Sequence, residues 1–249
     1  MVGPFSWCVR AFNINIWVML PIPFLAVSHL FVATLVWADY SSGLDAYKRE
    51  DYIVAVREWK PLAEQGHAQA QVSLGWLYLN GRGVVRDYAQ ARQYFEKAAA
   101  QGQAVAQYNL AQLYHSGQGG SQDDVQACHW YEKAALQGNV DAQVNLGTLY
   151  YNGRGCREDY QQALFWVLLA AKQGNALAFT KLGFMYEHGK GVTPDFVQAY
   201  KWYHLGGVNG EHLGAQSRDE LAARMTPDQI AEAQQLAKEW MVGRRYLSR

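Results

Sequence analysis

The sequence predicts an all-α fold, a right-handed α-solenoid built from helical hairpins that stack along the chain. Three observations lead to this prediction: a skeleton of residues that recurs four times without a slip in register, apolar residues at helical spacing within each copy, and glycines at fixed places between the helices. The period is 36 residues, the interval between Leu74, Leu110, Leu146 and Leu182. A fixed period in this range is typical of solenoids, in which one unit cannot bury its apolar surface until a neighbour stacks on it. The same interval separates Tyr78, Tyr114, Tyr150 and Tyr186; Gly83, Gly119, Gly155 and Gly191; Asp87, Asp123, Asp159 and Asp195; and Ala91, Ala127, Ala163 and Ala199.

The first half of each copy predicts an amphipathic helix. In the first copy, Ala70, Leu74 and Tyr78 are spaced four residues apart and therefore share one helix face. Gly75 lies inside this helix, where glycine costs about 1 kcal/mol relative to alanine. The sequence therefore predicts that a second helix approaches closely at Gly75.

The second half of each copy predicts a second helix after a glycine turn. Gly83 belongs to a turn that ends the first helix, because glycine tolerates a positive φ. Asp87 is suited to cap the free backbone N–H groups of the next helix. Phe95 and Ala98 lie on its inner face, and Gly102 ends it. Each unit is thus expected to be a hairpin of two helices, each about 13 to 15 residues long.

The repeated residues resemble Sel1-type repeats, which are related to TPR repeats. The resemblance rests on Leu-Gly-x-Leu-Tyr at 74–78, Gly-x-Gly at 81–83 and Tyr-Glu-Lys-Ala-Ala at 131–135, and it extends from about Asp45 to Gly210. It implies stacked hairpins whose first helices line a concave groove. It also implies an adaptor role, because Sel1-like proteins are mostly adaptors, often in bacterial signalling, envelope regulation or contact with a host.

The first 38 residues differ from the rest of the chain. Arg10 is their only charge, and residues 11–37 are uncharged and rich in large apolar side chains. The Val-Trp-Ala sequence at 36–38 suits a signal peptidase, so residues 1–38 are expected to form a signal peptide that is cleaved before Asp39. The alternative is an uncleaved transmembrane anchor, since the stretch is long enough to span a bilayer of about 30 Å. In either case the repeats are expected outside the cytoplasm, either periplasmic or secreted, or tethered to a membrane.

The rest of the chain is expected to form one elongated domain in three parts. Residues 39–66 are predicted to be an N-terminal capping hairpin, because the sequence from Asp51 onward is in register with the second helix of a repeat. Residues 67–210 hold the four repeats. Residues 211–249 are expected to form C-terminal capping helices and a tail, with Thr226 starting a helix through a capping box.

The charge balance argues against two classes of partner. Lysine and arginine together number 22, as do aspartate and glutamate, and no basic run stands out. Nucleic acid and anionic membrane surfaces are therefore unexpected partners. Contact with a membrane is expected only through residues 1–38, if they are not cleaved.

Two cysteines, Cys128 and Cys156, remain after the predicted leader. A disulfide between neighbouring units is one interpretation, if the compartment is oxidising. The two residues occupy non-equivalent positions of the repeat, however, and the pattern of one pair per unit found in disulfide-rich relatives is absent. The preferred interpretation is therefore that both side chains are unpaired and at least half-buried.

No motif for catalysis, metal binding or cofactor binding stands out. His129 and Glu132 share a helix face, but no second histidine completes a zinc motif. The glycine loops lack the Gly-Lys-Ser/Thr ending and the preceding strand of a phosphate-binding loop. Some related proteins have been linked to β-lactam binding or hydrolysis, but this sequence has no Ser-x-x-Lys motif. A non-enzyme without cofactor or metal is predicted.

Large aromatic residues occupy positions of the first helices that the repeat leaves free, namely Trp76, Tyr108, Tyr151 and Phe184. Such side chains on a groove are typical of a surface that binds a peptide or protein segment. An equally supported alternative is that they pack on neighbouring helices or on the terminal caps. Polar residues beside them are expected to hydrogen-bond a bound backbone or carboxylate: Asn109, Gln112, Asn145, Thr148 and Lys181.

The preferred hypothesis is an exported scaffold that binds a protein or peptide partner on its concave face, in envelope signalling or host contact. The main alternative is a periplasmic enzyme or ligand binder that acts on cell-wall-derived material. A pocket of converging polar groups would favour that alternative. A membrane-tethered assembly factor is a further alternative, which depends on whether residues 1–38 are retained.

Overall fold

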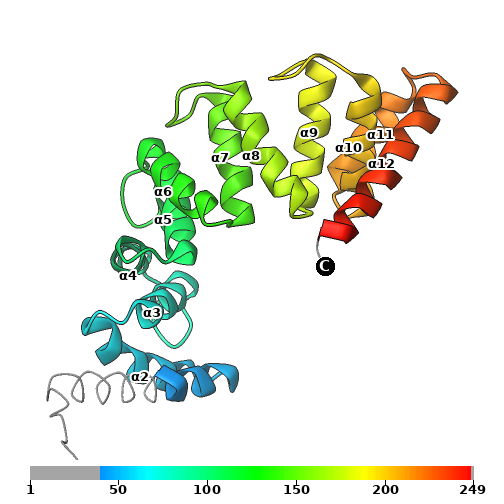
Figure 1. Cartoon of the computed structure of the whole chain (residues 1–249). Coiled ribbons are helices and arrows are strands. Elements are labelled where there is room, and N and C mark those ends of the chain that lie inside the picture. Colours follow the sequence, from blue (N-terminus) through cyan, green and yellow to red (C-terminus); the bar gives the residue numbers. More distant parts are fainter. Residues whose placement is uncertain (1–39, 248–249) are drawn as a thin grey trace, which may run out of the picture. The chain divides into compact units, whose positions relative to one another are not determined.

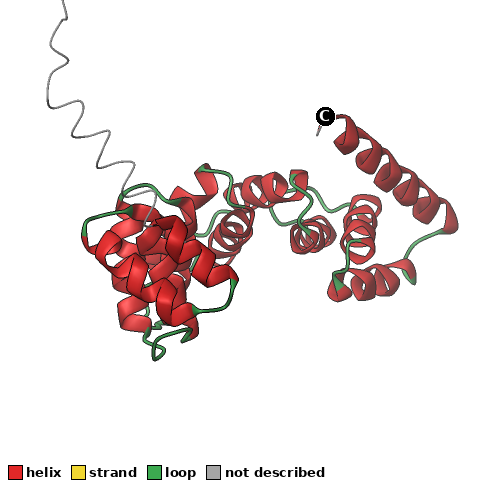
Figure 2. Ribbon diagram, turned by 90° about the horizontal axis from the view of Figure 1, so that it is seen from below, coloured by secondary structure: helices red, strands yellow, loops and turns green. Residues whose placement is uncertain are grey.

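The computed structural model describes the backbone of residues 40–247 and the side chains of residues 40–243. The predicted signal peptide, 1–38, lies outside the described residues. All regular secondary structure in the described part is helical (Figure 2), which confirms the all-α repeat prediction. A short helix over residues 40–48 precedes α2 (Tyr52–Glu64), α3 (Ala68–Asn80), α4 (Tyr88–Ala100), α5 (Ala104–Ser116), α6 (Asp124–Leu136), α7 (Val140–Asn152), α8 (Tyr160–Lys172), α9 (Ala176–His188), α10 (Phe196–Val208), α11 (His212–Ala222) and α12 (Pro227–Leu247).

The helices of the four repeats pair as the sequence predicts, with α3–α4, α5–α6, α7–α8 and α9–α10 as successive hairpins. Figure 1 shows them following one another in sequence order, and each helix packs chiefly on its neighbours in the chain. Every one of these eight helices has 13 residues, the lower end of the expected range. The arrangement explains why the period is strict, since an insertion in one helix would misplace both of its neighbours.

The predicted helix ends are confirmed in atomic detail. The Asp87 carboxylate accepts hydrogen bonds from the backbone N–H groups of Ala89 and Gln90, at 2.9 and 3.0 Å, and so caps α4. The equivalent aspartates cap α6, α8 and α10. Gly81 ends α3 in the left-handed region, at φ 66°, where glycine meets no steric cost.

The glycine inside the first helix has the predicted packing role. A Cβ atom added at Gly75 would lie 2.8 Å from the ring of Phe95 on α4. At the equivalent Gly147, it would lie 2.7 Å from Cγ2 of Val167 on α8. In these two hairpins the helices therefore approach more closely than an alanine would permit, whereas α5 has Ala111 at the equivalent position.

Each glycine loop reaches back onto the preceding unit. A Cβ atom at Gly83 would lie 2.5 Å from the carbonyl carbon and oxygen of Tyr52, at the start of the preceding second helix. Gly155 likewise lies against the backbone of Asp124 at the start of α6. Loop and helix start are therefore in contact between neighbouring units, although some 30 residues separate them in the sequence.

This contact corrects the expectation that Cys128 and Cys156 are unpaired. They form a disulfide, with their Cα atoms 6.0 Å apart, a usual separation for bonded cysteines. Cys156 follows Gly155 in the loop, and Cys128 lies one turn into α6. The positions are non-equivalent in the repeat, but the loop of one unit covers the helix start of the unit before it.

Buried glutamines connect successive hairpins through side-chain amides. Gln107 donates through Nε2 to the carbonyl oxygen of Ala99 at 3.2 Å, and its Oε1 accepts from Gln137 Nε2 at 2.7 Å. Gln71 and Gln143 make the same pair of bonds one period away on either side. Because a buried amide must find partners, these bonds fix how neighbouring units are oriented.

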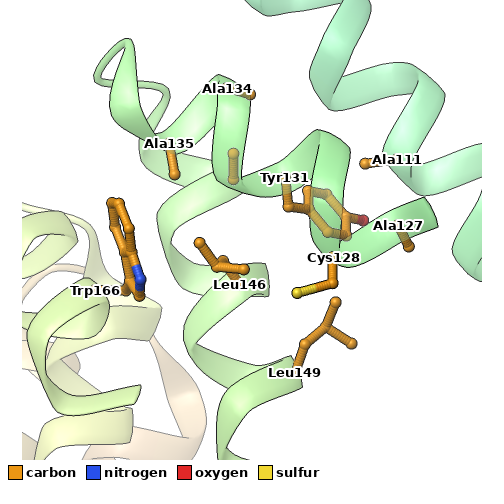
Figure 3. Close-up of a cluster of buried hydrophobic side chains, with 10 residues drawn as sticks. Ala111, Ala127, Cys128, Tyr131, Ala134, Ala135, Leu146, Leu149 and Trp166 are labelled. Atoms are coloured by element: carbon orange, nitrogen blue, oxygen red, sulfur yellow. The ribbon is translucent and has the colours of Figure 1, made fainter. Parts of the chain in front are cut away.

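The core is a series of linked apolar clusters between neighbouring hairpins. Figure 3 shows one of them, with Cys128 and Tyr131 of α6 beside Leu149 of α7, and Leu146 between them and Trp166 of α8. These five side chains come from two successive repeats. Stacking, rather than any one hairpin, therefore buries the apolar surface.

Additional helices cover both ends of the repeats. At the N-terminal end, Tyr40 stacks on Trp59 of α2, with ring centroids 5.5 Å apart. At the C-terminal end, Trp240 of α12 packs edge-on against Trp202 of α10, at 4.8 Å. The predicted capping box starts α12, because Thr226 and Gln229 each accept a hydrogen bond from the other's backbone N–H.

The fourth repeat departs from the pattern where α11 packs on it. Gly206 and Gly207 replace the pair of alanines found in the other copies. A Cβ atom at Gly207 would lie 3.0 Å from Cα of Ala215 on α11. The change therefore permits α11 to lie close against α10.

No helix in the described range 40–247 combines the length and apolar character needed to cross a bilayer.

Candidate functional site

The residues predicted to bind a partner lie on the first helices α3, α5, α7 and α9, on a surface that we call the first-helix face. Three cavities open along this face. We name them by position: the N-terminal cavity, of about 230 Å³, the central cavity, of about 450 Å³, and the C-terminal cavity, of about 280 Å³. Seven of the nine predicted residues line one or more of these cavities, and Tyr108 and Asn109 line none of them.

The N-terminal cavity contains Trp76, which packs partly on the N-terminal hairpin. Its ring meets Tyr47 edge-on at 6.1 Å, and the Arg82 guanidinium lies over it at 5.1 Å. Both contacts are within the range of favourable aromatic and cation–π interactions. Trp76 therefore has structural partners of its own, as the alternative interpretation of the aromatic residues anticipates.

The central cavity is the most polar of the three. Gln112, Asn145 and Thr148, all predicted site residues, contribute to its wall. The full lining comes from α5, α6, α7 and the loops that follow α5 and α7, and every member except Leu149 has a polar side chain: Gln112, His115, Ser116, Gln118, Tyr131, Asn145, Thr148, Leu149, Asn152 and Arg154. The donors and acceptors converge on a space large enough for a small polar ligand or a stretch of peptide.

The charges at the central cavity are internally compensated. Arg154 donates through Nη2 and Nε to the Asp124 carboxylate, at 2.8 and 3.2 Å, and His115 Nδ1 lies 2.6 Å from the other carboxylate oxygen. Burial alone would raise the pKa of Asp124, but the hydrogen bonds from His115 and Arg154 outweigh it and hold that pKa below its usual range. The cavity is therefore polar, but its arginine is not free to attract an anion.

Tyr108 stands beside the central cavity without lining it. Its hydroxyl accepts a hydrogen bond from Gln112 Nε2 at 2.7 Å, and its ring lies 5.9 Å from that of Tyr131. Burial raises the pKa of both tyrosines, although hydrogen bonds to Asn145 act in the opposite direction. Both hydroxyls therefore stay protonated and can donate a hydrogen bond at neutral pH.

The C-terminal cavity unites the other aromatic residues of the prediction. Tyr151 of α7 and Phe184 of α9 meet edge-on, with centroids 6.1 Å apart, and both line it together with Thr148 and Lys181. Leu213 lines it from α11, beyond the repeats. The remaining wall is mainly apolar and consists of Gly147, Asn152, Val167, Leu177, Met185 and Leu213. This cavity is therefore an apolar hollow with one cation.

Asn109 and Thr148 both form hydrogen bonds within their own helices. The side-chain amide of Asn109 donates to the carbonyl oxygen of Val105 in its own helix, at 2.7 Å, and the residue lines none of the three cavities described here. Thr148 also bonds its own helix, donating to the Val144 carbonyl at 2.8 Å, yet it lines both the central and the C-terminal cavities. Thr148 thus marks where these two cavities meet.

Several lining residues were not among the predicted site residues. His115 and Arg154 reach the central cavity from the end of α5 and from a glycine loop, and Leu213 reaches the C-terminal cavity from α11. One sequence signal did exist: the residue between the loop glycines is Arg82, Arg154 or Lys190 in three of the four repeats. Leu213 lies outside the periodic region and has no such signal.

Metal-binding side chains do not gather anywhere in the described residues. In that part of the chain, no three histidine, cysteine, aspartate or glutamate residues lie close enough together to hold an ion. The interactions that the first-helix face offers are hydrogen bonds, apolar contacts and one unpaired ammonium group.

Comparison with known proteins agrees with this architecture. The Sel1 repeat model matches residues 68–103, 104–139, 140–175 and 177–207, which is more than half of the chain. No curated protein sequence matches significantly.

Two solved structures are similar over most of the chain. One is a protective antigen present in uropathogenic Escherichia coli strains that displays an SLR fold; it is 32% identical, with a TM-score of 0.76 over 83% of this chain. The chain spans 45% of the length of that protein. The other is a Sel1 repeat protein from Oxalobacter formigenes, 34% identical, with a TM-score of 0.68 over 73% of this chain and 74% of that one. The chain therefore belongs to the family of Sel1 repeat proteins.

Proposed function

We propose that this protein is an exported scaffold that binds a segment of a protein partner along the first-helix face, in envelope signalling or in contact with a host. Sel1 repeats generally mediate interactions between proteins and are typically non-catalytic. The observation that carries the proposal is the row of cavities on the first-helix face, lined in part by side chains that the repeat does not require. Adjoining polar and apolar cavities suit an extended segment, whose backbone and side chains need different surroundings.

Two further observations support export. The Cys128–Cys156 disulfide suits an oxidising compartment, since cytosolic thiols are usually kept reduced. The similar Escherichia coli protein is described as a protective antigen, a description that fits a protein reached by antibodies. Cleavage is tested by sequencing the N-terminus of the exported protein. A chain that begins at Asp39 supports a signal peptide, and one that retains Met1 supports a membrane anchor.

Binding is tested by a crosslinking pull-down from the exported fraction of cells that express the full chain. The site variant is Leu177→Ala/Phe184→Ala, because these side chains on the first-helix face are 40% and 42% exposed. The matched control is Leu136→Ala/Phe165→Ala on the second helices, where the exposed fractions are 72% and 51%. Trp76 and Tyr108 are left intact because both side chains are less exposed than Phe184, so truncating them would remove more of the packing.

The expected result is a partner protein retained by the wild type and the control variant but lost by the site variant, with all three showing the same circular dichroism. Retention by all three would place binding elsewhere. Loss by both variants would show that exposed apolar area, rather than the first-helix face, captures the partner.

A second candidate function is supported by the central cavity. Converging amide, hydroxyl and imidazole groups in a hollow of about 450 Å³ also suit a small polar ligand, such as a cell-wall-derived glycopeptide. Thermal denaturation in the presence of soluble peptidoglycan fragments tests this candidate. A rise in the melting temperature of the wild type that is absent in Asn145→Ala would favour it, and no shift would remove it.

A further inference from the structure

We propose that the C-terminal cavity binds a partner segment in which a large apolar side chain lies next to an acidic one, with the apolar side chain filling the cavity and the carboxylate pairing with Lys181. This inference rests on the proposed function and specifies the chemistry of the segment recognised.

The mouth of the cavity is unusually apolar for a surface. Leu177, Phe184 and Leu213 line it, and Leu213 is 54% exposed. Behind them lie the buried side chains of Val167 and Met185. Exposed apolar side chains scattered singly need no explanation, but three around one hollow are typical of a binding site.

The cation in this cavity is particular to the fourth repeat. The position of Lys181 holds Ser73, Asn109 and Asn145 in the other three copies, so the repeat itself does not require a charge there. The other two side chains that form the mouth within the repeats also differ from their counterparts. Phe184 corresponds to Trp76, Gln112 and Thr148, and Leu177 to Gln69, Val105 and Asp141.

Lys181 has no carboxylate partner in the described part of the chain. No ion pair forms at its ammonium group there, and burial lowers its pKa with no acidic group acting against the shift. Arg154 at the central cavity shows the contrast, since Asp124 neutralises it at 2.8 Å. A partly desolvated ammonium group without a counter-ion is unfavourable on its own and is stabilised by an incoming carboxylate. Charge complementarity therefore selects an acidic group for the C-terminal cavity and not for the central one.

The dimensions favour a peptide as the occupant. The volume of about 280 Å³ lies at the lower limit of pockets that enclose a whole drug-sized ligand. Thr148 and Asn152 line both this cavity and the central one, so the two cavities adjoin. A segment anchored at Lys181 can therefore extend its backbone toward the amides and hydroxyls of the central cavity, which an isolated small carboxylate would leave unused.

The test uses the full chain on an array of immobilised peptides. Two adjacent central positions run through all pairs of amino acids other than cysteine, and the flanking positions are equal mixtures of glycine, serine, asparagine and glutamine. Three variants accompany the wild type: Lys181→Met, which removes the charge; Lys181→Arg, which keeps it; and Phe184→Ala, which opens the apolar mouth. Each variant is used only after its circular dichroism and melting curve match those of the wild type.

We expect the wild type to prefer pairs of aspartate or glutamate with leucine, isoleucine, methionine or phenylalanine over the same pairs with asparagine or glutamine. The preference should be about tenfold or more, the factor expected of one charge-assisted hydrogen bond. Lys181→Met should abolish it, Lys181→Arg should retain it, and Phe184→Ala should weaken binding to all apolar pairs.

Three outcomes would overturn the inference: no preference of the wild type for acids over amides, a preference that survives in Lys181→Met, or displacement of the peptides by decanoate at lower concentration than by a free acidic–apolar peptide. The last outcome would assign the cavity to a small amphiphilic carboxylate. The pull-down decides the proposed function separately. A partner that needs the first-helix face, combined with an array that shows no acidic preference, would leave the scaffold intact and remove only this inference.

Discussion

The contact between each glycine loop and the preceding unit leads to a quantitative prediction. Gly83 and Gly102 lie in the same repeat, and both have positive φ, at 70° and 87°. An added Cβ at Gly83 would lie 2.5 Å from the backbone of Tyr52, whereas a Cβ at Gly102 would meet nothing within 4 Å. Replacing each glycine by alanine therefore separates the cost of the backbone conformation from the cost of contact between units.

The expected magnitudes follow from these two environments. A left-handed conformation costs a residue with a Cβ about 1–2 kcal/mol, and alanine regains about 0.4–1 kcal/mol by restricting the unfolded chain. Both terms apply equally to Gly83→Ala and Gly102→Ala. Gly83→Ala additionally forces the loop away from Tyr52, an overpacking cost of about 1–3 kcal/mol. That difference between the two variants measures the contact alone.

The assay is urea unfolding of the full chain, followed by circular dichroism under non-reducing conditions. We expect Gly83→Ala to unfold at a clearly lower urea concentration than Gly102→Ala, with similar slopes. If the two variants lose the same free energy of unfolding, the loop contact contributes nothing and glycine is required at Gly83 only for its φ angle. If Gly102→Ala is the less stable of the two variants, the reasoning about close approach is wrong.

Three further predictions concern the junctions between helices. Gln103 precedes α5 without a side-chain cap, whereas Asn139, at nearly the same φ and ψ, caps α7; Gln103→Asn should therefore raise the free energy of unfolding by about 0.5–1 kcal/mol in urea, and an unchanged midpoint would contradict the capping argument. The double variant Cys128→Ser/Cys156→Ser should lose about 2–4 kcal/mol and become insensitive to reductant, whereas the wild type should lose a similar amount on reduction; a wild type indifferent to reductant would count against the disulfide. The pKa of Asp124 is lower in the folded state than its ordinary value of about 3.9, so its stabilisation is present above that pH and is lost as the pH falls through the folded pKa. The stability advantage of the wild type over Asp124→Asn should accordingly be constant near pH 5 and shrink toward pH 2.5, and an advantage that grows on acidification would refute the assignment.

The candidate site was only partly predictable from the sequence. The period identified which positions of the first helices vary between repeats. Three of the residues at such positions, Tyr151, Lys181 and Phe184, line one cavity. The same argument could not separate an aromatic residue with a free face from one already engaged. Trp76 packs edge-on against Tyr47 of the N-terminal hairpin, whose position relative to α3 depends on packing between units.

The disulfide shows why repeat equivalence can mislead. Cys128 and Cys156 differ in their place within the repeat and belong to different hairpins. They bond because a loop crosses to the previous unit at Gly155. Contact between non-equivalent positions is a property of the stacking geometry, which no pattern within one unit expresses.

The sequence by itself determined the helices, their ends and their order, because these depend on interactions within about one turn of each residue. Aspartate caps, glycine stops and apolar spacing act locally, and the 36-residue period carries them from unit to unit. Only the tertiary structure decided which side chains from different units meet: Cys128 with Cys156, Arg154 with Asp124, and Leu213 with Phe184 at one cavity. Those meetings depend on how closely and at what angle hairpins stack, and that is set by many side-chain contacts acting together.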